Sequence, residues 1–312
     1  MANYITIDSG TTNTRVSLVA HGRIVDVRKY NVGAKKGMEN GQLLRDALKN
    51  GITDILQANQ MKEEQIECIL ASGMITSEFG LVNLPLIIAP AGAKELYESL
   101  YRCSLQEISK IPFVFVRGIK TEGDSLENAD MMRGEETELL GCYEGAGTYI
   151  LPGSHSKIIE VDEQGRVVRF KTMLTGEMIA ALSQGTILKD AVELQDFAVD
   201  EEYLLKGYEY ARDHGLNEAL FKVRILKNLF EKSPEQIYNF YRGVVLCDEI
   251  GQILAGEPVK IVIGGKKQIK AFMASLLAKL TDTEVVLITD ERAEYATAYG
   301  IIRVYEFGKL KS

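Results

Sequence analysis

The stretch from residue 4 to residue 20 constrains the fold most, because it joins two strands through a turn that suits an anion. Residues 4–8 and 14–20 have the apolar patterns of strands, and the turn between them holds Gly10, Thr11, Thr12 and Asn13. Glycine reaches positive φ at little steric cost, and such a turn directs successive backbone N–H groups into one concavity. Asp8 could hold a hydrated Mg²⁺ against phosphates, and Arg15 could bind a phosphate or an acidic substrate group. A solvated hairpin without a ligand is the alternative.

The same plan recurs in the middle of the chain. Residues 148–151 predict a strand that resumes at residues 158–161, and the turn between them, residues 152–157, supplies Gly153, Ser154, His155 and Lys157. Two such turns are what a duplicated nucleotide-binding fold needs, one from each domain. A Gly264-Gly265 step after a buried strand at residues 260–263 lets backbone approach a base or ribose closely. This loop lacks the spaced glycine and the Lys-Ser/Thr ending of a Walker A loop.

Repeated strand and helix patterns predict α/β layers, with the opening hairpins adding antiparallel strands. Apolar spacing predicts an amphipathic helix over residues 41–60 and helices over residues 182–255, with breaks near residues 213–217 and 233–234. A buried strand is expected at residues 66–71. The residues after it that we expect at the carboxyl end of the sheet, where α/β folds place ligands, are Ser72, Gly73, Met74 and Thr76.

Paired carboxylates mark a short helix within residues 131–141. Glu135 and Glu136 fall in its first turn, where the helix dipole favours negative charge. Ordinary helix-start chemistry would explain the pair, but two adjacent carboxylates can also divide two tasks, one holding a metal and one accepting a proton. Arg133, directly before them, could face a transferring phosphate or a substrate carboxylate.

Composition and charge exclude several kinds of partner. The chain has 312 residues, enough for two domains, and its formal charge of −8 argues against nucleic-acid or anionic-membrane binding. A negative protein that binds nucleotide must concentrate its positive groups locally, and the candidates are Arg15, Arg133, Lys157 and Lys266. The cysteines are scattered, without Cys-x-x-Cys spacing, and no apolar run reaches membrane-spanning length. We therefore expect a cytoplasmic protein with reduced thiols.

The order of these motifs resembles the sugar-kinase branch of the fold shared by actin, hexokinase and the heat-shock ATPases. The segments that resemble its first phosphate loop, second phosphate loop, adenosine loop and closing helix are residues 8–13, 153–156, 262–265 and 294–300. Within that branch, Met-Arg-Gly-Glu-Glu-Thr at residues 132–137 and Leu-Pro-Gly-Ser-His at residues 151–155 closely resemble the 2-dehydro-3-deoxygalactonokinase family. The resemblance is collinear over nearly the whole chain.

The resemblance implies two ribonuclease-H-like domains with an interdomain cleft. We expect them at residues 1–146 and 147–312, with the closing helix near residues 293–306 packed back on the first. It also implies ATP-dependent phosphorylation of the 6-hydroxyl of 2-dehydro-3-deoxy-D-galactonate in galactonate degradation. ATP and Mg²⁺ would lie between the domains, with the sugar acid on the first, and domain closure would exclude water.

Roles for individual residues follow from the same resemblance. Related sugar kinases carry an aspartate base where this chain has glutamate, so we expect Glu135 as base and Glu136 as metal ligand or supporting partner, an order that could be reversed. Arg133 completes the expected catalytic set. The expected nucleotide contacts are Asp8, Gly10, Thr11, Thr12, Asn13, Gly153, Ser154, His155, Lys157, Gly264 and Gly265, with Asp8 and Glu136 on the metal. The expected substrate contacts are Arg15, Ser72, Gly73, Met74, Thr76 and Glu177.

Other functions fit part of the pattern. A kinase for another small acid would keep everything but the acceptor, and a phosphatase of the same fold would use water instead. A sugar-binding regulator or a filament-forming actin relative would have no catalytic role. Sequence leaves open which epimer of the sugar acid is used and whether the chain forms a homodimer.

Overall fold

The computed structural model describes residues 2–39, 41–123, 125–265 and 267–309, so Lys266 lies outside the described residues. The chain divides into two compact units. The first comprises Met1–Gly145, Asp162–Arg169 and Glu291–Ser312, and the second comprises Ala146–Val161 and Phe170–Asp290. The predicted domain boundary after residue 146 stays a prediction.

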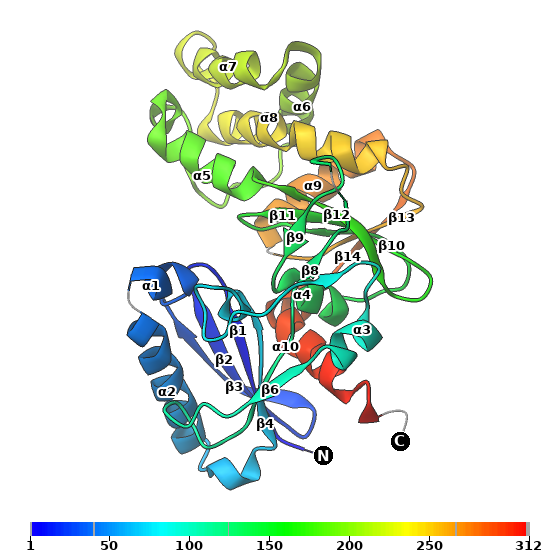
Figure 1. The fold of residues 1–312 in the computed structure, drawn as a ribbon. Coiled ribbons are helices and arrows are strands. Elements are labelled where there is room, and N and C mark those ends of the chain that lie inside the picture. The colour runs from blue at the N-terminus through cyan, green and yellow to red at the C-terminus, as the bar shows by residue number, and fades with distance from the viewer. Residues whose placement is uncertain (1, 40, 124, 266, 310–312) are drawn as a thin grey trace. The chain divides into compact units, whose positions relative to one another are not determined.

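The first unit is built on a mixed sheet (Figure 1). Its strands, in spatial order, are β3 (Arg23–Tyr30), β2 (Thr14–Ala20), β1 (Tyr4–Ser9), β4 (Cys68–Gly73), β7 (Phe113–Phe115) and β6 (Tyr101–Cys103). The opening meander is antiparallel, whereas β1, β4 and β7 run parallel. The carboxyl ends of these parallel strands therefore meet at one edge, where the chain turns into the predicted ligand-binding segments.

The sheet of the second unit repeats this plan. Its strands, in spatial order, are β12 (Val167–Met173, of which this unit contains the part from Phe170 on), β11 (Ser156–Val161), β10 (Gly147–Leu151), β13 (Lys260–Ile263) and β14 (Glu284–Leu287). Strand β10 pairs antiparallel with β11 and parallel with β13, as β1 does with β2 and β4. Because the two sheets share this pairing pattern, they confirm the predicted duplication.

Helices cover both sheets. The first unit contains α1 (Ala34–Glu39), α2 (Gly41–Ala58), α3 (Ala93–Glu98), α4 (Glu135–Gly141) and most of α10 (Asp290–Glu306). The second contains α5 (Thr175–Gly185), α6 (Glu201–His214), α7 (Leu216–Asn228), α8 (Pro234–Ala255) and α9 (Lys267–Leu280). Short 3₁₀ turns lie at Glu63–Gln65, Met74–Thr76 and Ile187–Asp190. A small additional sheet joins β5 (Ile87–Ile88), β8 (Ile119–Lys120) and β9 (Met131–Met132).

Helix α10 approaches α4 so closely that only small residues fit between them. A Cβ on Gly141 would lie 1.9 Å from the carbonyl oxygen of Ala296, and a Cβ on Gly300 would lie 1.7 Å from that of Thr137. Arg292 also donates from Nε to the Gly141 carbonyl at 3.0 Å. The run of small residues near the C-terminus thus serves this contact, which fixes the helix that carries the paired carboxylates.

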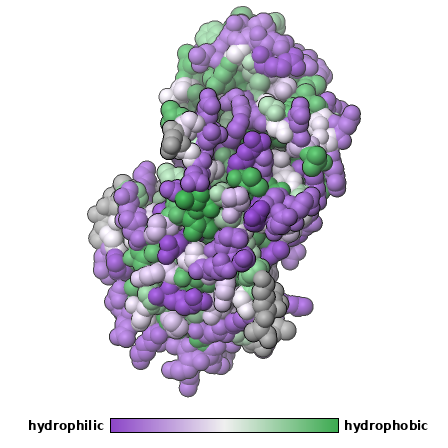
Figure 2. Space-filling view, turned by 45° about the vertical axis from the view of Figure 1, so that its right-hand side comes forward, coloured by the Kyte–Doolittle hydropathy of each residue, from purple (hydrophilic) through white to green (hydrophobic). Residues whose placement is uncertain are grey.

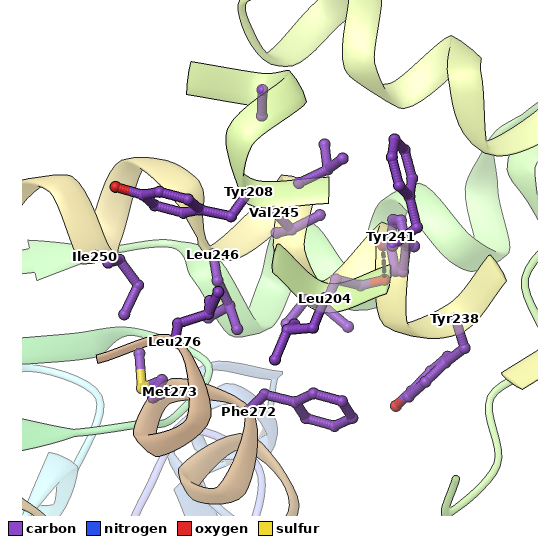
Figure 3. Packing of buried hydrophobic residues seen from close by; sticks show 14 of the residues in the cluster. Leu204, Tyr208, Tyr238, Tyr241, Val245, Leu246, Ile250, Phe272, Met273 and Leu276 are labelled. Atoms are coloured by element: carbon purple, nitrogen blue, oxygen red, sulfur yellow. Dashed lines mark hydrogen bonds between the residues drawn. The ribbon is translucent and has the colours of Figure 1, made fainter. Parts of the chain in front are cut away.

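The core of the second unit forms where α6, α8 and α9 meet (Figure 3). Leu204 on α6, Tyr241 on α8 and Leu276 on α9 are each at most 1% exposed. Burying a large apolar side chain contributes about 1.5–3 kcal/mol, so this cluster holds the three helices together. Ser233 accepts the N–H of Gln236 and caps α8 at the predicted break.

Two local predictions were wrong in detail. The strand expected at residues 66–71 is β4, Cys68–Gly73, so Ser72 and Gly73 end the strand instead of following it. The predicted helices within residues 182–255 also break after Asp190, and α6 begins only at Glu201, where Asp200 caps it by accepting the Tyr203 N–H. The capping aspartate was the available signal for that start.

The visible surface is largely hydrophilic, with a few apolar patches (Figure 2). Among the described residues, no helix combines the length and the apolar character needed to cross a membrane.

Candidate active site

The first turn is fixed by helix α1. The Gly10 N–H donates to the Asn13 carbonyl at 2.9 Å and closes the turn, so this amide is used internally. The N–H groups of Ala34 and Lys35 donate to the carbonyls of Gly10 and Thr11 at 3.0 and 2.9 Å. The turn itself is exposed. The start of α1 therefore fixes this exposed turn by hydrogen bonds to the carbonyl groups of the turn.

Asp8 lies at the end of β1 in a cluster of charges. Asp8 as a whole residue is partly exposed, but burial of its carboxyl and the nearby Glu135 carboxylate raise its pKa, against the opposing effects of Arg15 and a hydrogen bond from Thr297. Arg15 stands opposite Asp8 in the β1–β2 register and donates to the carbonyl of Glu294. Thr297 was missed by sequence reasoning, because nothing in the small-residue helix distinguishes the threonine that reaches Asp8.

Three chain segments converge on Gly73. In the parallel β1–β4 register, Asp8 is opposite Ser72 and Ser9 is opposite Gly73. Gly73 has φ of 91°, and a Cβ there would lie 2.5 Å from the Ser9 carbonyl oxygen. A Cβ on Gly134, which has φ of 110°, would lie 3.3 Å from the Gly73 Cα. These close approaches bring the ends of β1 and β4 to the start of α4.

Glu136 is the buried member of the carboxylate pair, at 1% exposure. The Gly134 N–H donates to its Oε1 and Oε2 at 2.9 and 2.8 Å, and the Ser72 hydroxyl donates to Oε1 at 3.1 Å. Burial and the charge of Glu135 outweigh these bonds and raise the pKa of Glu136 to about 8. Its oxygens face protein donors, an arrangement suited to a supporting role.

Glu135 is the more accessible member of the pair. Its side chain is partly exposed, and its Oε2 accepts the N–H of Arg133 at 3.0 Å. The first turn of α4 thus presents one carboxylate near the surface and keeps the next one inside. This difference distinguishes the two residues, which adjacent positions in the sequence could not.

Arg133 is occupied by the segment that follows β4. Its Nη1 donates to the carbonyl and hydroxyl oxygens of Thr76 at 2.8 and 3.0 Å, and its Nη2 donates to the Leu84 carbonyl at 2.9 Å. Burial lowers the pKa of Arg133. Among the expected substrate contacts, Ser72 and Thr76 are fully buried and Gly73 is buried, whereas Met74 is partly exposed. The guanidinium therefore fixes the segment after β4, which contains the expected substrate contacts.

The second turn packs against the start of α5. A Cβ on Gly176 would lie 2.1 Å from the Gly153 carbonyl oxygen. The Glu177 N–H donates to the Ser154 carbonyl at 3.2 Å, and His155 Nε2 lies 3.0 Å from Glu177 Oε1. Glu177 therefore supports the second turn in this unit, although the sequence assigned it to the sugar acid.

The two remaining expected nucleotide segments join the same turn. Lys157 is 3% exposed, and its Nζ donates to the His155 carbonyl at 3.2 Å. The Gly264 N–H donates to the Ile150 carbonyl at 2.9 Å. A Cβ on Gly265, at φ of 71°, would lie 2.8 Å from the Pro152 carbonyl oxygen. The second turn and the Gly-Gly step are thus a single packed structure.

The donor set near Asp8 suits Mg²⁺. No group of three or more His, Cys, Asp or Glu side chains that could hold a metal occurs among the described residues. Mg²⁺ usually keeps several waters and takes one or two carboxylates together with substrate phosphates, so the partly exposed Asp8 fits such an ion.

Comparison with known proteins identifies the family and the fold. A family model described as 2-keto-3-deoxy-galactonokinase matches residues 8–304. The 2-dehydro-3-deoxygalactonokinase of Escherichia coli (strain K12) is 28% identical over 259 residues, which cover 81% of this chain and 80% of that protein. The structure of a putative 2-dehydro-3-deoxygalactonokinase protein from Sinorhizobium meliloti superposes with a TM-score of 0.80 at 21% identity, covering 98% of this chain and 96% of the other. A more distant fold match is the activator of 2-hydroxyisocaproyl-CoA dehydratase from Clostridium difficile, with a TM-score of 0.53 at 12% identity, covering 99% and 96%.

Proposed function

The chain belongs to the 2-keto-3-deoxy-galactonokinase family, and we propose that it transfers the γ-phosphoryl group of ATP to the 6-hydroxyl of 2-dehydro-3-deoxy-D-galactonate. The observation that carries the proposal is the family match, which extends over residues 8–304 and includes both turns and the carboxylate pair. Membership confirms the family and enzyme class predicted from the sequence, a phosphotransferase of galactonate degradation.

Glu135 is the proposed proton acceptor. Phosphoryl transfer depends mainly on positioning and charge stabilisation, with a carboxylate placed to accept the proton of the attacking hydroxyl. As that hydroxyl oxygen bonds to the γ-phosphorus, the bond to the β-phosphate oxygen breaks and ADP leaves. Glu135 suits this role because its side chain is partly exposed, whereas Glu136 is 1% exposed and bonded to Gly134 and Ser72.

Asp8 is the residue we assign to Mg²⁺, through its carboxylate or the waters of the ion. When bound, Mg²⁺ neutralises charge on the phosphate oxygens. The electrostatic surroundings of Asp8 support the assignment, because burial and Glu135 together disfavour its ionised form more than Arg15 and Thr297 favour it. A cation would relieve that repulsion. Glu136 acts here as the supporting partner that fixes the start of α4.

The sugar acid is assigned to the edge where β1 and β4 end. Gly73 and Met74 supply backbone and a partly exposed side chain there, with Ser72 and Thr76 beneath them. Arg15 is our candidate for the substrate carboxylate, since bidentate pairing with arginine is the strongest recognition available for that group. Arg133 holds the segment from Thr76 to Leu84 in place, so we assign it an indirect effect on the sugar acid through this segment.

We assign the transferring phosphoryl group of ATP to the first turn. In the second unit, the turn at Gly153, Ser154 and His155 and the glycines at 264 and 265 are assigned to the remaining phosphates and the adenosine. The close packing of these two segments on each other supports a common ligand.

The test is a coupled assay of ADP release with Mg²⁺ and ATP against both epimers of the 2-dehydro-3-deoxy acid, common hexoses and a water-only control. Turnover confined to the galactonate epimer is expected. Equal rates with both epimers would broaden the substrate to sugar acids of this type. ADP release without an acceptor would favour a phosphatase, and no release with any acceptor would contradict the proposal.

A further inference from the structure

Glu249 is a buried acid next to the second turn to which the reaction assigns no role. It lies on α8 and is 0% exposed. Its Oε1 accepts the hydroxyl of Ser156, which ends the turn and begins β11, and the Thr175 side chain at the start of α5 also hydrogen-bonds to it. One carboxyl group therefore joins three elements of the second unit.

This carboxyl is costly to the fold. Its Oε2 is buried and has no hydrogen-bond partner in the described parts of the chain. Burial and the charge of Asp248 raise the pKa of Glu249, which shows that its surroundings disfavour the ionised form. An apolar residue of similar size would avoid the penalty of an unsatisfied buried oxygen. Stability alone therefore gives a poor reason for an acid here.

The groups that Glu249 holds are those that shape the second turn. Thr175 precedes Gly176, whose Cα approaches the turn so closely that an added Cβ would lie 2.1 Å from the Gly153 carbonyl oxygen. Glu177, one residue further, donates its N–H to the Ser154 carbonyl. Ser156 anchors the other end of the same turn. Loss of the carboxyl would release both anchors at once.

We propose that Glu249 is a positioning residue for ATP, whose carboxyl fixes the second turn against α5 by holding Ser156 and Thr175 together. The inference rests on the proposed function, because it takes the phosphates of ATP as the ligand of this turn. Glu249 acts through the turn and is buried beneath it.

The experiment measures KM for ATP, KM for the sugar acid and kcat in Glu249→Met. Methionine keeps the approximate size of the side chain but cannot accept a hydrogen bond from either hydroxyl, so KM for ATP should rise about tenfold or more. KM for the sugar acid should stay unchanged, since its assigned residues belong to the first unit. Asp248→Asn is the matched control, because it removes a negative charge from the adjacent, exposed position. It also relieves the repulsion that raises the pKa of Glu249, so it should not raise KM for ATP.

Ser156→Ala provides a second, smaller perturbation in case Glu249→Met does not fold. It should also raise KM for ATP, and the double variant should show less than the sum of the two effects, because both remove one anchor. Unchanged KM for ATP in both variants, with only a lower melting temperature, would overturn the proposal. Calorimetric titration with ADP separates this outcome from failure of the proposed function. If no sugar acid were phosphorylated, weaker ADP binding by the variants would still support the positioning role, and equal binding would overturn it.

Discussion

Gly134 donates its backbone N–H to both carboxyl oxygens of Glu136, at 2.9 and 2.8 Å, across the first turn of α4. This contact keeps Glu136 inside the protein and leaves the preceding glutamate nearer the surface. Gly134 reaches this geometry at φ of 110°, which a residue with a side chain rarely adopts. The conformation of one glycine therefore separates two adjacent acids into a buried and an accessible one.

The first prediction concerns the pH dependence of stability. The pKa of Glu136 is raised from 4.5 to about 8, so the folded protein holds a proton that the unfolded chain releases between these pH values. Its contribution to stability is therefore greatest below pH 4.5 and is lost as the pH rises to about 8, by roughly 1.4 kcal/mol per pH unit at most. Glu136→Gln removes this titration, so its free energy of unfolding should fall less than that of the wild type from pH 5 to pH 8. Denaturant unfolding at intervals of pH measures the difference, and parallel curves would contradict it.

The second prediction tests the proton acceptor. Glu135→Gln should lower kcat by about a hundredfold to ten-thousandfold, the usual contribution of a general base, while the affinity for ATP is kept. Glu138→Gln makes the same change one turn later in α4 and should retain near-normal turnover. If Glu136→Gln lost turnover and Glu135→Gln kept it, the two roles would have to be exchanged.

The third prediction separates a metal role of Asp8 from a purely structural one. Asp8→Asn should raise the Mg²⁺ concentration needed for half-maximal rate by roughly tenfold or more. Its melting temperature should not fall, because the surroundings of Asp8 raise its pKa and disfavour the charge. A Mg²⁺ titration of the initial rate and a thermal melt measure the two quantities. Unchanged Mg²⁺ dependence with a lower melting temperature would assign Asp8 to the turn alone.

Sequence predicted the fold because the strand and helix patterns agree with the tertiary structure. The buried strands and the stripe of Leu44, Leu48 and Ile52 on α2 have the apolar spacing of the elements that they form. The sheet of β5, β8 and β9 was not predicted, since strands of two residues are too short to show any period. Pairing across distant segments decides such strands, and one sequence does not contain that information.

The local structure of the candidate segments was predictable from the sequence, whereas the roles of their residues stay predictions. The motifs indicated where the two turns, the start of α4 and the Gly-Gly step fall along the chain, because turns and helix starts depend on local chemistry. They could not show that the Arg133 guanidinium would be bonded to Thr76 and Leu84. They also could not show that Glu249, far from every motif, would reach Ser156. Such contacts depend on which elements pack together.

The fourth prediction measures how much the convergence at Gly73 contributes to the site. Gly73→Ala combines a positive φ of 91° with a Cβ 2.5 Å from the Ser9 carbonyl oxygen, so the end of β1, which carries Asp8, must move. Gly145→Ala is the matched control, because Gly145 has φ of 97° but no described atom within 4 Å of an added Cβ. The control should lose about 1–2 kcal/mol of stability from backbone strain alone.

Gly73→Ala should lose about 1–3 kcal/mol more than that control, from overpacking. It should also raise KM for the sugar acid, whereas the control should leave KM unchanged. Equal losses of stability in the two variants, with unchanged KM in both, would show that the close approach to Ser9 relaxes without moving the site. A rise in KM for the sugar acid in Gly73→Ala alone would instead show that the site needs the close approach of β1 to β4, which only a glycine at position 73 permits.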